Sequence, residues 1–226
     1  MKIAIIEDDK SISNAIAVAF EFRWPETRVV ASPNGKDGIS LVRQEAPDAV
    51  ILDINLPDMS GFDVLKAIRK FSDVPVIILT VRADDADVLR GLEAEADDYI
   101  TKPFNYLTLL ARVKAVLRRS EKAPLKLQKT IALSPRLNID FVNQKVRVDN
   151  RLVKLTPVEY QLLILLVKNK DQAVSYQQIM EDVWGRTSWE DTENLRIYIR
   201  RLRRKLGDLP PTMILNVRGA GYIFKS

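Results

Sequence analysis

Short apolar runs rich in β-branched residues alternate with segments of helical periodicity throughout the first half of the chain, and this alternation constrains the fold most strongly. The apolar runs include residues 2–6, 49–52 and 76–79. Between them, apolar residues recur at helical spacing, as at Ile12, Ala15, Ile16 and Ala19. Repeated alternation of this kind indicates a parallel sheet covered by helices on both faces. The first half is therefore predicted to be an α/β domain.

Polar side chains stand where these apolar runs end. They are Glu7 and Asp8, Asp53, Thr80, and Lys102. Because open α/β sheets place their ligand sites at the carboxyl ends of the strands, we expect these groups to converge on one edge. Clustered acids repel one another unless a cation lies among them, and oxygen ligands favour Mg²⁺. The pattern predicts a Mg²⁺ site in which Lys102 balances negative charge that develops on Asp53.

The composition excludes several classes of site. The chain has no Cys and no His, which excludes disulfides, thiolate metal sites, His-ligated zinc, His-based triads and a histidine phospho-donor within this chain. It shows neither a signal-peptide pattern nor an apolar run of about 18 residues, so a cytoplasmic protein without a membrane span is expected. Charge is uneven: residues 1–120 carry 16 Lys and Arg against 19 Asp and Glu, and residues 121–226 carry 19 against 11. This asymmetry suggests that the second half binds a polyanion.

The second half has a different pattern. Alternating residues in 139–141, 145–148 and 152–155 predict a small antiparallel sheet. Thr156-Pro157-x-Glu159 has the form of a capping box, and a helix through about Lys168 follows. Two further helices are predicted over 176–183 and 192–206, and a Gly-containing hairpin over 214–224. We therefore divide the chain into a first domain at 1–119, a linker at 120–126 and a second domain at 127–226.

The helix predicted at 192–206 is apolar on one side and basic on the other. Its apolar stripe consists of Leu195, Ile199, Leu202 and Leu206. The opposite side is expected to carry Arg196, Ile197, Arg200, Arg201 and Arg204. A solvated charged face is the ordinary explanation, but these Arg residues are not interleaved with Glu at i±4. With a preceding helix and a basic hairpin, the pattern favours a winged helix-turn-helix that binds DNA.

Motifs in both halves, taken in order, resemble one family. They are Glu7-Asp8-Asp9, Asp53-Ile-Asn-Leu-Pro57, Leu-Thr80, Ala96-Asp-Asp-Tyr99 with Lys102-Pro103, Leu155-Thr-Pro-x-Glu159, Val183-Trp-Gly185 and Val217-Arg-Gly-x-Gly-Tyr222. In this order and spacing the chain resembles a two-component response regulator of the OmpR/PhoB type over essentially its whole length. The resemblance implies a flavodoxin-like (CheY-like), five-stranded parallel receiver domain followed by a winged-helix effector domain.

The resemblance also implies chemistry and partners. A sensor histidine kinase would donate a phosphoryl group to Asp53, with Mg²⁺ held by Asp8, Asp53, the backbone carbonyl of Asn55 and water ordered by Glu7. Lys102 and Thr80 would bind phosphoryl oxygens and Tyr99 would follow Thr80, although ordinary strand-end packing also explains Thr80 and Tyr99. The phosphorylated chain would form a homodimer on promoter DNA and meet RNA polymerase.

The resemblance further implies which residues would form the dimer interface and which would contact DNA. The expected dimer residues are Arg90, Asp97, Asp98 and Arg112. The expected DNA contacts are Arg196, Ile197, Arg200, Arg201, Arg203 and Arg204 on the helix and Arg218 on the hairpin. The chain departs from the family at Thr108, where an acid is common, and at Glu95, where Gly is usual. If the backbone is left-handed at Glu95, the cost is about 1 to 2 kcal/mol.

Three other functions stay open at this stage. The first is a constitutive DNA-binding regulator whose receiver is degenerate. The second is a Mg²⁺-dependent hydrolase that forms an aspartyl-phosphate, although Asn55 stands where a second acid is expected. The third is a DNA-processing enzyme, although its acids and its basic helix would lie in different domains. We expect no enzyme activity beyond the receiver's own phosphotransfer and dephosphorylation.

Overall fold

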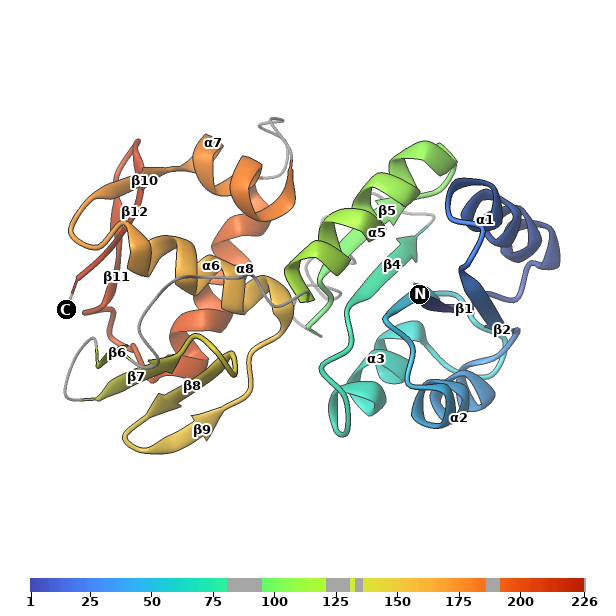
Figure 1. The fold of residues 1–226 in the computed structure, drawn as a ribbon, viewed down its shortest axis with the longest axis horizontal. Coiled ribbons are helices and arrows are strands. Elements are labelled where there is room, and N and C mark those ends of the chain that lie inside the picture. Colours follow the sequence, from blue (N-terminus) through green and yellow to red (C-terminus); the bar gives the residue numbers. More distant parts are fainter. Residues whose placement is uncertain (81–94, 121–130, 133–135, 186–191, 226) are drawn as a thin grey trace. The chain divides into compact units, whose positions relative to one another are not determined.

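The computed structural model describes residues 1–80, 95–120, 131–132, 136–185 and 192–225 (Figure 1). The chain divides into two compact units, Met1–Arg118 and Arg119–Ser226. Where the chain is described, the first unit contains one sheet and the second contains two. Of the expected linker, 120–126, all but the first residue lies outside the described residues.

The first unit is built on a five-stranded parallel sheet. Its strands are β1 (Lys2–Ile6), β2 (Arg28–Ser32), β3 (Ala49–Asp53), β4 (Val76–Thr80) and β5 (Asp98–Thr101), in the order β2-β1-β3-β4-β5. Its described helices are α1 (Lys10–Arg23), α2 (Gly35–Glu45), α3 (Gly61–Arg69) and α5 (Tyr106–Ser120) (Figure 1). The predicted α/β fold is confirmed.

Successive residues of the central strands supply two separate cores. Ile3 and Ile5 of β1 pack with apolar residues of α1 and α5, whereas Ala4 and Ile6 pack with those of α2 and α3. This split follows from the period of two along a strand, which sends neighbouring side chains to opposite faces. A strand buried on both faces reads as a continuous apolar run, as β1 and β3 do. Each fully buried Ile or Leu stabilises the fold by about 1.5 to 3 kcal/mol.

Side-chain caps fix where three helices of this unit begin. Asp9 accepts hydrogen bonds from the backbone N–H groups of Ser11 and Ile12 at the start of α1. Asn34 caps α2 and Ser60 caps α3 in the same manner. Because α1 follows β1 directly and α3 follows β3 after a short loop, these caps order the chain around the carboxyl edge of the sheet.

The second unit combines two antiparallel sheets with a group of helices. A four-stranded sheet runs in the order β6 (Ile131–Ala132), β7 (Leu137–Asp140), β8 (Lys145–Val148) and β9 (Arg151–Val153). The helices are α6 (Pro157–Lys168), α7 (Tyr176–Ile179), the π-helical turn η1 (Met180–Trp184) and α8 (Thr192–Leu206). The second sheet places β12 (Gly221–Phe224) between β10 (Ala173–Ser175) and β11 (Ile214–Val217).

The local predictions for this unit hold with small shifts in their boundaries. Thr156 and Glu159 form the predicted capping box at the start of α6. The helix expected over 176–183 begins as α7 and continues as the π-helical turn. It ends at Gly185, whose φ of 69° is the left-handed conformation that glycine adopts at helix ends. With α8 and the β11–β12 hairpin, these elements form the predicted winged helix-turn-helix.

The predicted apolar stripe of α8 is buried. Leu195, Ile199, Leu202 and Leu206 are each at most 1% exposed. Burial extends beyond this stripe to Tyr198, whose ring centroid lies 4.9 Å from that of Trp184. More of the helix surface is therefore covered than the stripe alone predicts.

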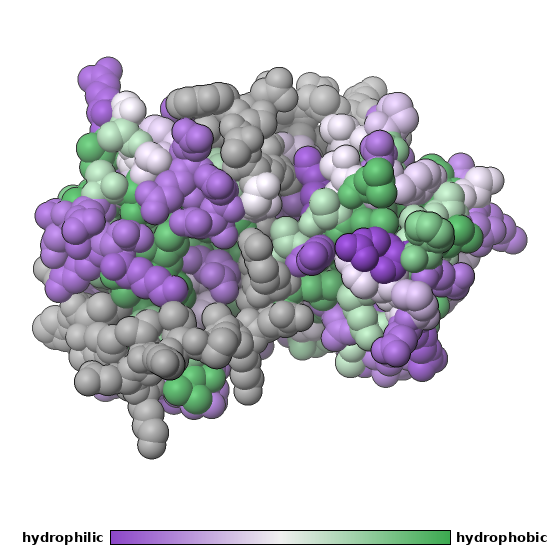
Figure 2. All heavy atoms as spheres, turned by 45° about the horizontal axis from the view of Figure 1, so that its top comes forward, coloured by the Kyte–Doolittle hydropathy of each residue, from purple (hydrophilic) through white to green (hydrophobic). Residues whose placement is uncertain are grey.

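On the face shown in Figure 2, polar and apolar residues are interspersed within each unit. Two large apolar side chains of α1 are exposed: Val18 by 63% and Phe22 by 91%. No helix within the described ranges is both long enough and apolar enough to cross a membrane.

Candidate functional site

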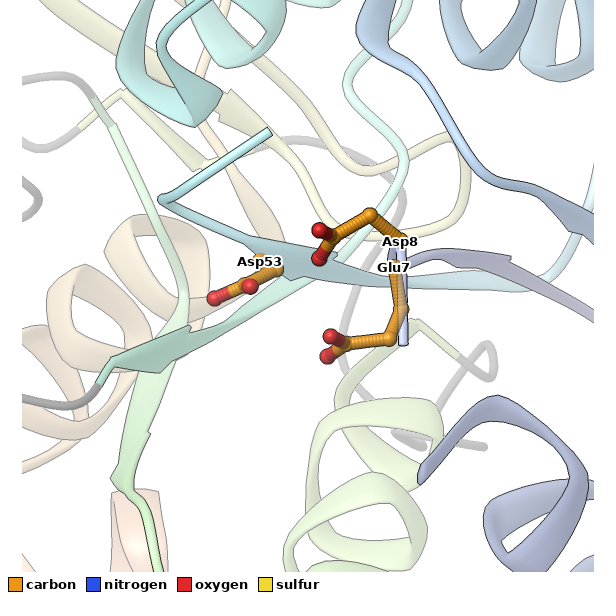
Figure 3. A group of neighbouring side chains, drawn as sticks. All are labelled: Glu7, Asp8 and Asp53. Carbon is orange, nitrogen blue, oxygen red and sulfur yellow. The ribbon is translucent and has the colours of Figure 1, made fainter. Parts of the chain in front are cut away.

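Three carboxylates gather at the carboxyl edge of the parallel sheet. Asp53 ends β3 and is buried, Glu7 follows β1 and is buried, and Asp8 is exposed. One oxygen of each group lies within 4.8 Å of the others. Figure 3 shows the three groups turned to the same side, from the adjacent ends of the two strands. The predicted convergence of these acids is confirmed.

The side chain of Lys102 lies between the two buried acids, Glu7 and Asp53. It follows β5, and its backbone N–H donates to the carbonyl oxygen of Thr80 at 2.6 Å. Its Nζ donates to Glu7 Oε2 at 2.7 Å and lies 3.1 Å from Asp53 Oδ2. A single ammonium group therefore bridges two carboxylates from neighbouring strands.

Burial and pairing shift the pKa values of this group. Burial raises the pKa of Glu7, the hydrogen bond from Lys102 opposes that rise, and the negative charge of Asp53 adds to it. For Lys102, burial alone would lower the pKa. Hydrogen bonds and charges of Glu7 and Asp53 outweigh burial, so the pKa of Lys102 is raised. Lys102 is therefore held as a cation against the two acids.

The donor set fits a hard divalent cation. All three side chains offer carboxylate oxygens, which suit Mg²⁺ better than a soft metal. Both oxygens of Glu7 already accept hydrogen bonds, from Lys102 and from the backbone N–H of Asp9. Within the described residues, no hydrogen bond or ion pair reaches the exposed Asp8 carboxylate. Asp8 and Asp53 are thus the acids best placed to bind a metal directly, with Glu7 acting through water.

Thr80 and Tyr99 occupy adjacent strands next to this cluster. Thr80 ends β4, is buried, and is in register with Thr101. Tyr99 is half-buried and packs against the core on the α2 and α3 side of the sheet. Thr80 follows Leu79, the register partner of Asp53, and Tyr99 is in register with Ile78 of the same strand.

The outward side of α8 carries three exposed arginines at intervals of four residues: Arg196, Arg200 and Arg204. Since residues four apart lie on one helix face, they form a row along α8. Ile197 is half-buried beside this row. These four are the predicted DNA contacts that the structure leaves accessible on the helix.

Two predicted DNA contacts on α8 bind groups inside the domain, and the prediction that Arg201 lies on the surface is wrong. Arg201 is 2% exposed, and its Nη2 lies 2.9 Å from Glu159 Oε1 of α6. Arg203 donates from Nε and Nη2 to the carbonyl oxygen of Ile214, at 2.9 and 2.6 Å. Both guanidinium groups serve interactions inside the domain, because α6 and β11 cover the two flanks of the apolar stripe.

Arg218 stands at the tip of the β11–β12 hairpin. It is exposed and precedes Gly219, whose φ of 74° turns the chain in a conformation that side chains disfavour. Gly221, the first residue of β12, faces the carbonyl oxygen of Val174 in β10 so closely that a Cβ would overlap it. Gly219 therefore allows the tight turn that presents Arg218 to solvent, and Gly221 allows β12 to pack against β10.

Comparison with known proteins agrees with this architecture. A family model described as the response regulator receiver domain matches residues 3–114, and one described as transcriptional regulatory protein, C terminal, matches residues 150–224. The chain is 36% identical over 226 residues to the transcriptional regulatory protein KdpE of Mycobacterium tuberculosis, covering 99% of each. The chain belongs to the response-regulator family. It is also 40% identical over 238 residues to the probable transcriptional regulator ycf27 of Guillardia theta, covering 99% of this chain and 90% of that protein.

Solved structures include similar two-domain chains. DrrB of Thermotoga maritima, an OmpR/PhoB homologue, is 32% identical with a TM-score of 0.53, covering 100% of this chain and 99% of that one. A mutant of RitR is 26% identical with a TM-score of 0.77, covering 99% and 98%. This response regulator is therefore a DNA-binding transcriptional regulator with a CheY-like receiver and an OmpR/PhoB-type effector domain, as predicted.

The acids expected on the dimer face of the response regulator are engaged within the receiver. Asp97 is fully buried, where its Oδ2 accepts from Arg69 at 2.8 Å and from the backbone N–H of Val76 at 2.9 Å. Its assignment to the surface was wrong, because this carboxylate connects Arg69 at the end of α3 to the start of β4. Asp98 pairs with Arg112 of the same receiver at 2.9 Å. Arg90, the fourth expected residue, lies outside the described residues.

Glu95 adopts the left-handed conformation considered for it, with φ of 73°. Its carbonyl oxygen accepts two hydrogen bonds from Arg69, from Nε at 3.1 Å and from Nη2 at 2.9 Å. These bonds to a charged donor offset the cost of a non-glycine residue in this conformation. Arg69 therefore stabilises the left-handed backbone at Glu95.

Asp58 is a site-positioning residue that sequence analysis missed. It lies in the loop after β3, and its carboxylate accepts from the backbone N–H groups of Gly35 at 2.7 Å and Lys36 at 2.9 Å. Those two hydrogen bonds, which lower the pKa of Asp58, join the loop that carries Asn55 to the start of α2. The partners are more than 20 residues apart, so no local pattern could reveal the contact.

Proposed function

We propose that this response regulator receives a phosphoryl group on Asp53 from a sensor histidine kinase and then binds promoter DNA as a homodimer. The observation that supports the phosphorylation site best is the cluster around Asp53. Its carboxylate ends a buried strand, 3.1 Å from an ammonium group and beside two further acids. A nucleophilic carboxylate, a cation for the incoming phosphoryl oxygens and ligands for a metal are thereby gathered at one sheet edge.

The transfer needs one bond to form and one to break. An Asp53 oxygen attacks phosphorus while the bond from phosphorus to the kinase imidazole nitrogen breaks, and that nitrogen keeps the electron pair. Lys102, which already pairs with Asp53, balances the charge that gathers on the transferred group. The product is an acyl phosphate on the chain and a dephosphorylated kinase.

Mg²⁺ is the proposed cofactor, held by Asp8, Asp53 and the backbone carbonyl of Asn55, with Glu7 acting through water. Bound there, it would neutralise negative charge on the phosphoryl oxygens. The fit rests on the oxygen-only donor set and on the exposed Asp8 carboxylate.

Phosphorylation is proposed to act through added charge near Thr80 and Tyr99. A phosphoryl group adds about −1.5 to −2 charge next to Lys102 and gives Thr80 a new acceptor for its hydroxyl. Tyr99 follows on the adjacent strand. The face formed by β5 and α5 is the proposed dimer contact, and it carries the Asp98–Arg112 pair.

DNA is proposed to meet the exposed basic groups of the effector domain. Arg196, Arg200 and Arg204, with Ile197, would enter the major groove, and Arg218 would reach the minor groove or the backbone. Bound to a promoter, the regulator would act in the cytoplasm and contact RNA polymerase.

A phosphorylation assay on the full chain tests this proposal. Incubation with acetyl phosphate and Mg²⁺ should add one phosphoryl group to the wild type, detected as a mass increase. Asp53→Ala should gain none. Asp8→Ala should gain it more slowly, because it loses a metal ligand but keeps the nucleophile.

Two outcomes would contradict the proposal. Equal labelling of wild type and Asp53→Ala would place the phosphoryl group elsewhere. An unlabelled wild type that still binds DNA would favour a constitutive regulator with a degenerate receiver. Denaturant unfolding of each variant separates a lost site from a lost fold.

A further inference from the structure

Glu159 joins two helices through a carboxylate that is wholly buried. Its Oε2 accepts from the backbone N–H of Thr156 at 2.9 Å, as the capping box requires. The same oxygen accepts from Lys205 Nζ at 2.8 Å, and Oε1 lies 2.9 Å from Arg201 Nη2. The residue that caps α6 is therefore also the acceptor for two cations of α8.

These two contacts hold α8 at separate points. Arg201 and Lys205 are one turn apart, about 6 Å along the axis at 1.5 Å per residue. Two attachments to one fixed carboxylate restrict both rotation about that axis and sliding along it. The Arg201 guanidinium also lies 5.2 Å from the centroid of the Tyr198 ring, which limits it further.

The basic residues of α8 thus fall into two sets. An inward set is engaged inside the domain and consists of Arg201, Arg203 and Lys205. An outward set is exposed and consists of Arg196, Arg200 and Arg204. If Arg201 and Lys205 turned outward, the buried charge of Glu159 would be left uncompensated. If Arg203 turned outward, the carbonyl oxygen of Ile214 would lose two hydrogen bonds.

We propose that Glu159 is a positioning residue for DNA recognition: through Arg201 and Lys205 it fixes α8 so that Arg196, Arg200 and Arg204 face the groove. On this account Arg201 touches no DNA. The inference rests on the proposed DNA contacts of α8 and adds the residue that orients them.

The dependence of DNA binding on salt separates the two sets. The probe is a duplex selected by the wild-type full chain from a random-sequence pool, with an unrelated duplex for comparison. Arg200→Ala, the matched control on the adjacent residue, should lower the slope of log affinity against log salt by about one if it contacts a phosphate, or relax preference at one base pair if it reads a base. Arg201→Ala should weaken specific binding about tenfold, the scale of one misaligned base contact, with the slope unchanged.

Paired substitutions distinguish a role of Glu159 in positioning α8 from a role in folding alone. Glu159→Gln should destabilise the domain because Arg201 and Lys205 both lose their carboxylate, and Arg201→Met should destabilise it because Glu159 then keeps only Lys205. The double variant Glu159→Gln/Arg201→Met removes the two most buried charges and leaves only Lys205, which is partly exposed, so its stability should recover in large part. Its specific affinity should stay about tenfold low, because neither ion pair to residue 159 then fixes α8. Arg201→Lys keeps a cation at Glu159 and should recover most of the affinity.

Three results would overturn the inference. A salt slope lowered by about one in Arg201→Ala, or relaxed preference at a single base pair, would mean that Arg201 contacts DNA. Recovery of both stability and affinity in the double variant would mean that Glu159 only supports folding. Unchanged affinity in every Glu159 and Arg201 variant would mean that the pair orients nothing. If the wild type selects no duplex, the proposed DNA function fails instead.

Discussion

Three buried carboxylates in the two units pair with a basic side chain, yet these pairs serve different ends. Asp97 with Arg69 and Glu159 with Arg201 are enclosed pairs that connect elements of one domain. Asp53 with Lys102 lies at a sheet edge beside the exposed Asp8. An ion pair that is enclosed in a domain keeps both of its members. At a sheet edge, the basic side chain can instead pair with an incoming anion. Exposure of a neighbouring acid therefore distinguishes the pair at the proposed phosphorylation site from the enclosed ones.

Asp208 is another buried acid, and it connects α8 to the hairpin. Its Oδ1 accepts from the backbone N–H groups of Thr212 and Met213, and its Oδ2 accepts from that of Ile214. Burial alone would raise the pKa of Asp208. The backbone hydrogen bonds outweigh burial and hold the pKa below its ordinary value of 3.8.

Asp208→Asn should lower the free energy of unfolding by about 1 to 3 kcal/mol at neutral pH, because a weaker acceptor faces buried N–H groups. A depressed native pKa means that ionised Asp208 stabilises the wild type above pH 3.8. That stabilisation is lost as pH falls through the native pKa. Denaturant unfolding at a series of pH values should show the two proteins converging in acid. A gap that does not change with pH would contradict the assignment.

Residue-level prediction succeeded where a side chain stands at the end of a recognisable element. Parallel strands bring their carboxyl ends together, and this rule predicted that Asp53, Glu7, Asp8 and Lys102 would lie close to one another. Arg201 was misjudged, because helix periodicity places it away from the apolar stripe and cannot show that Glu159 covers it. A polar residue that is buried with a distant partner looks the same in sequence as an exposed one.

At the scale of elements, the approach of α3 to β3 sets the position of Asp53. Gly61 is the first residue of α3, and its backbone N–H donates to the carbonyl oxygen of Ile54 at 2.8 Å. A Cβ at Gly61 would overlap the carbonyl oxygen of Asp53 and come within 2.8 Å of the Ile54 Cα. Backbone cannot rotate away as a side chain can. Glycine here allows the helix to begin directly against the proposed phosphorylation site.

Gly61→Ala should therefore shift the end of β3, slow phosphorylation of Asp53 and reduce stability by about 1 to 3 kcal/mol. Gly35→Ala is the matched control, since Gly35 is the first residue of α2 and its Cβ would meet side chains of Met59 and Val64. A flexible Met side chain can move, so this variant should be affected less. Labelling rates with acetyl phosphate and unfolding curves compare the two. Equal rates for Gly61→Ala and wild type would show that the contact does not position Asp53.

Most elements followed from periodicity and capping signals. The capping box at Thr156 and Glu159 marked the start of α6, and the apolar stripe marked α8. The π-helical turn after α7 was not predicted, because sequence periodicity does not distinguish one wider turn from continued α-helix. The link from Asp58 to the start of α2 was also missed, since it depends on how two distant loops meet.

For the whole molecule, charge is divided in the way that the two functions require. Residues 1–120 have a small excess of acids, 19 against 16 basic residues, and hold the proposed metal and phosphoryl site. Residues 121–226 have 19 basic residues against 11 acids and hold the exposed arginines of α8 and the hairpin. An acidic site that gains a phosphoryl group and a basic surface that meets DNA are thus carried by separate units.

Phosphorylation of Asp53 is proposed to control DNA binding by the other unit. Fluorescence anisotropy on the selected duplex, with and without acetyl phosphate and Mg²⁺, measures this coupling in the full chain. Phosphorylation should tighten wild-type binding about tenfold, within the usual range of coupling between two sites, and leave Asp53→Ala unchanged. An equal gain in Asp53→Ala, or no gain in a wild type whose mass shows the added phosphoryl group, would contradict it.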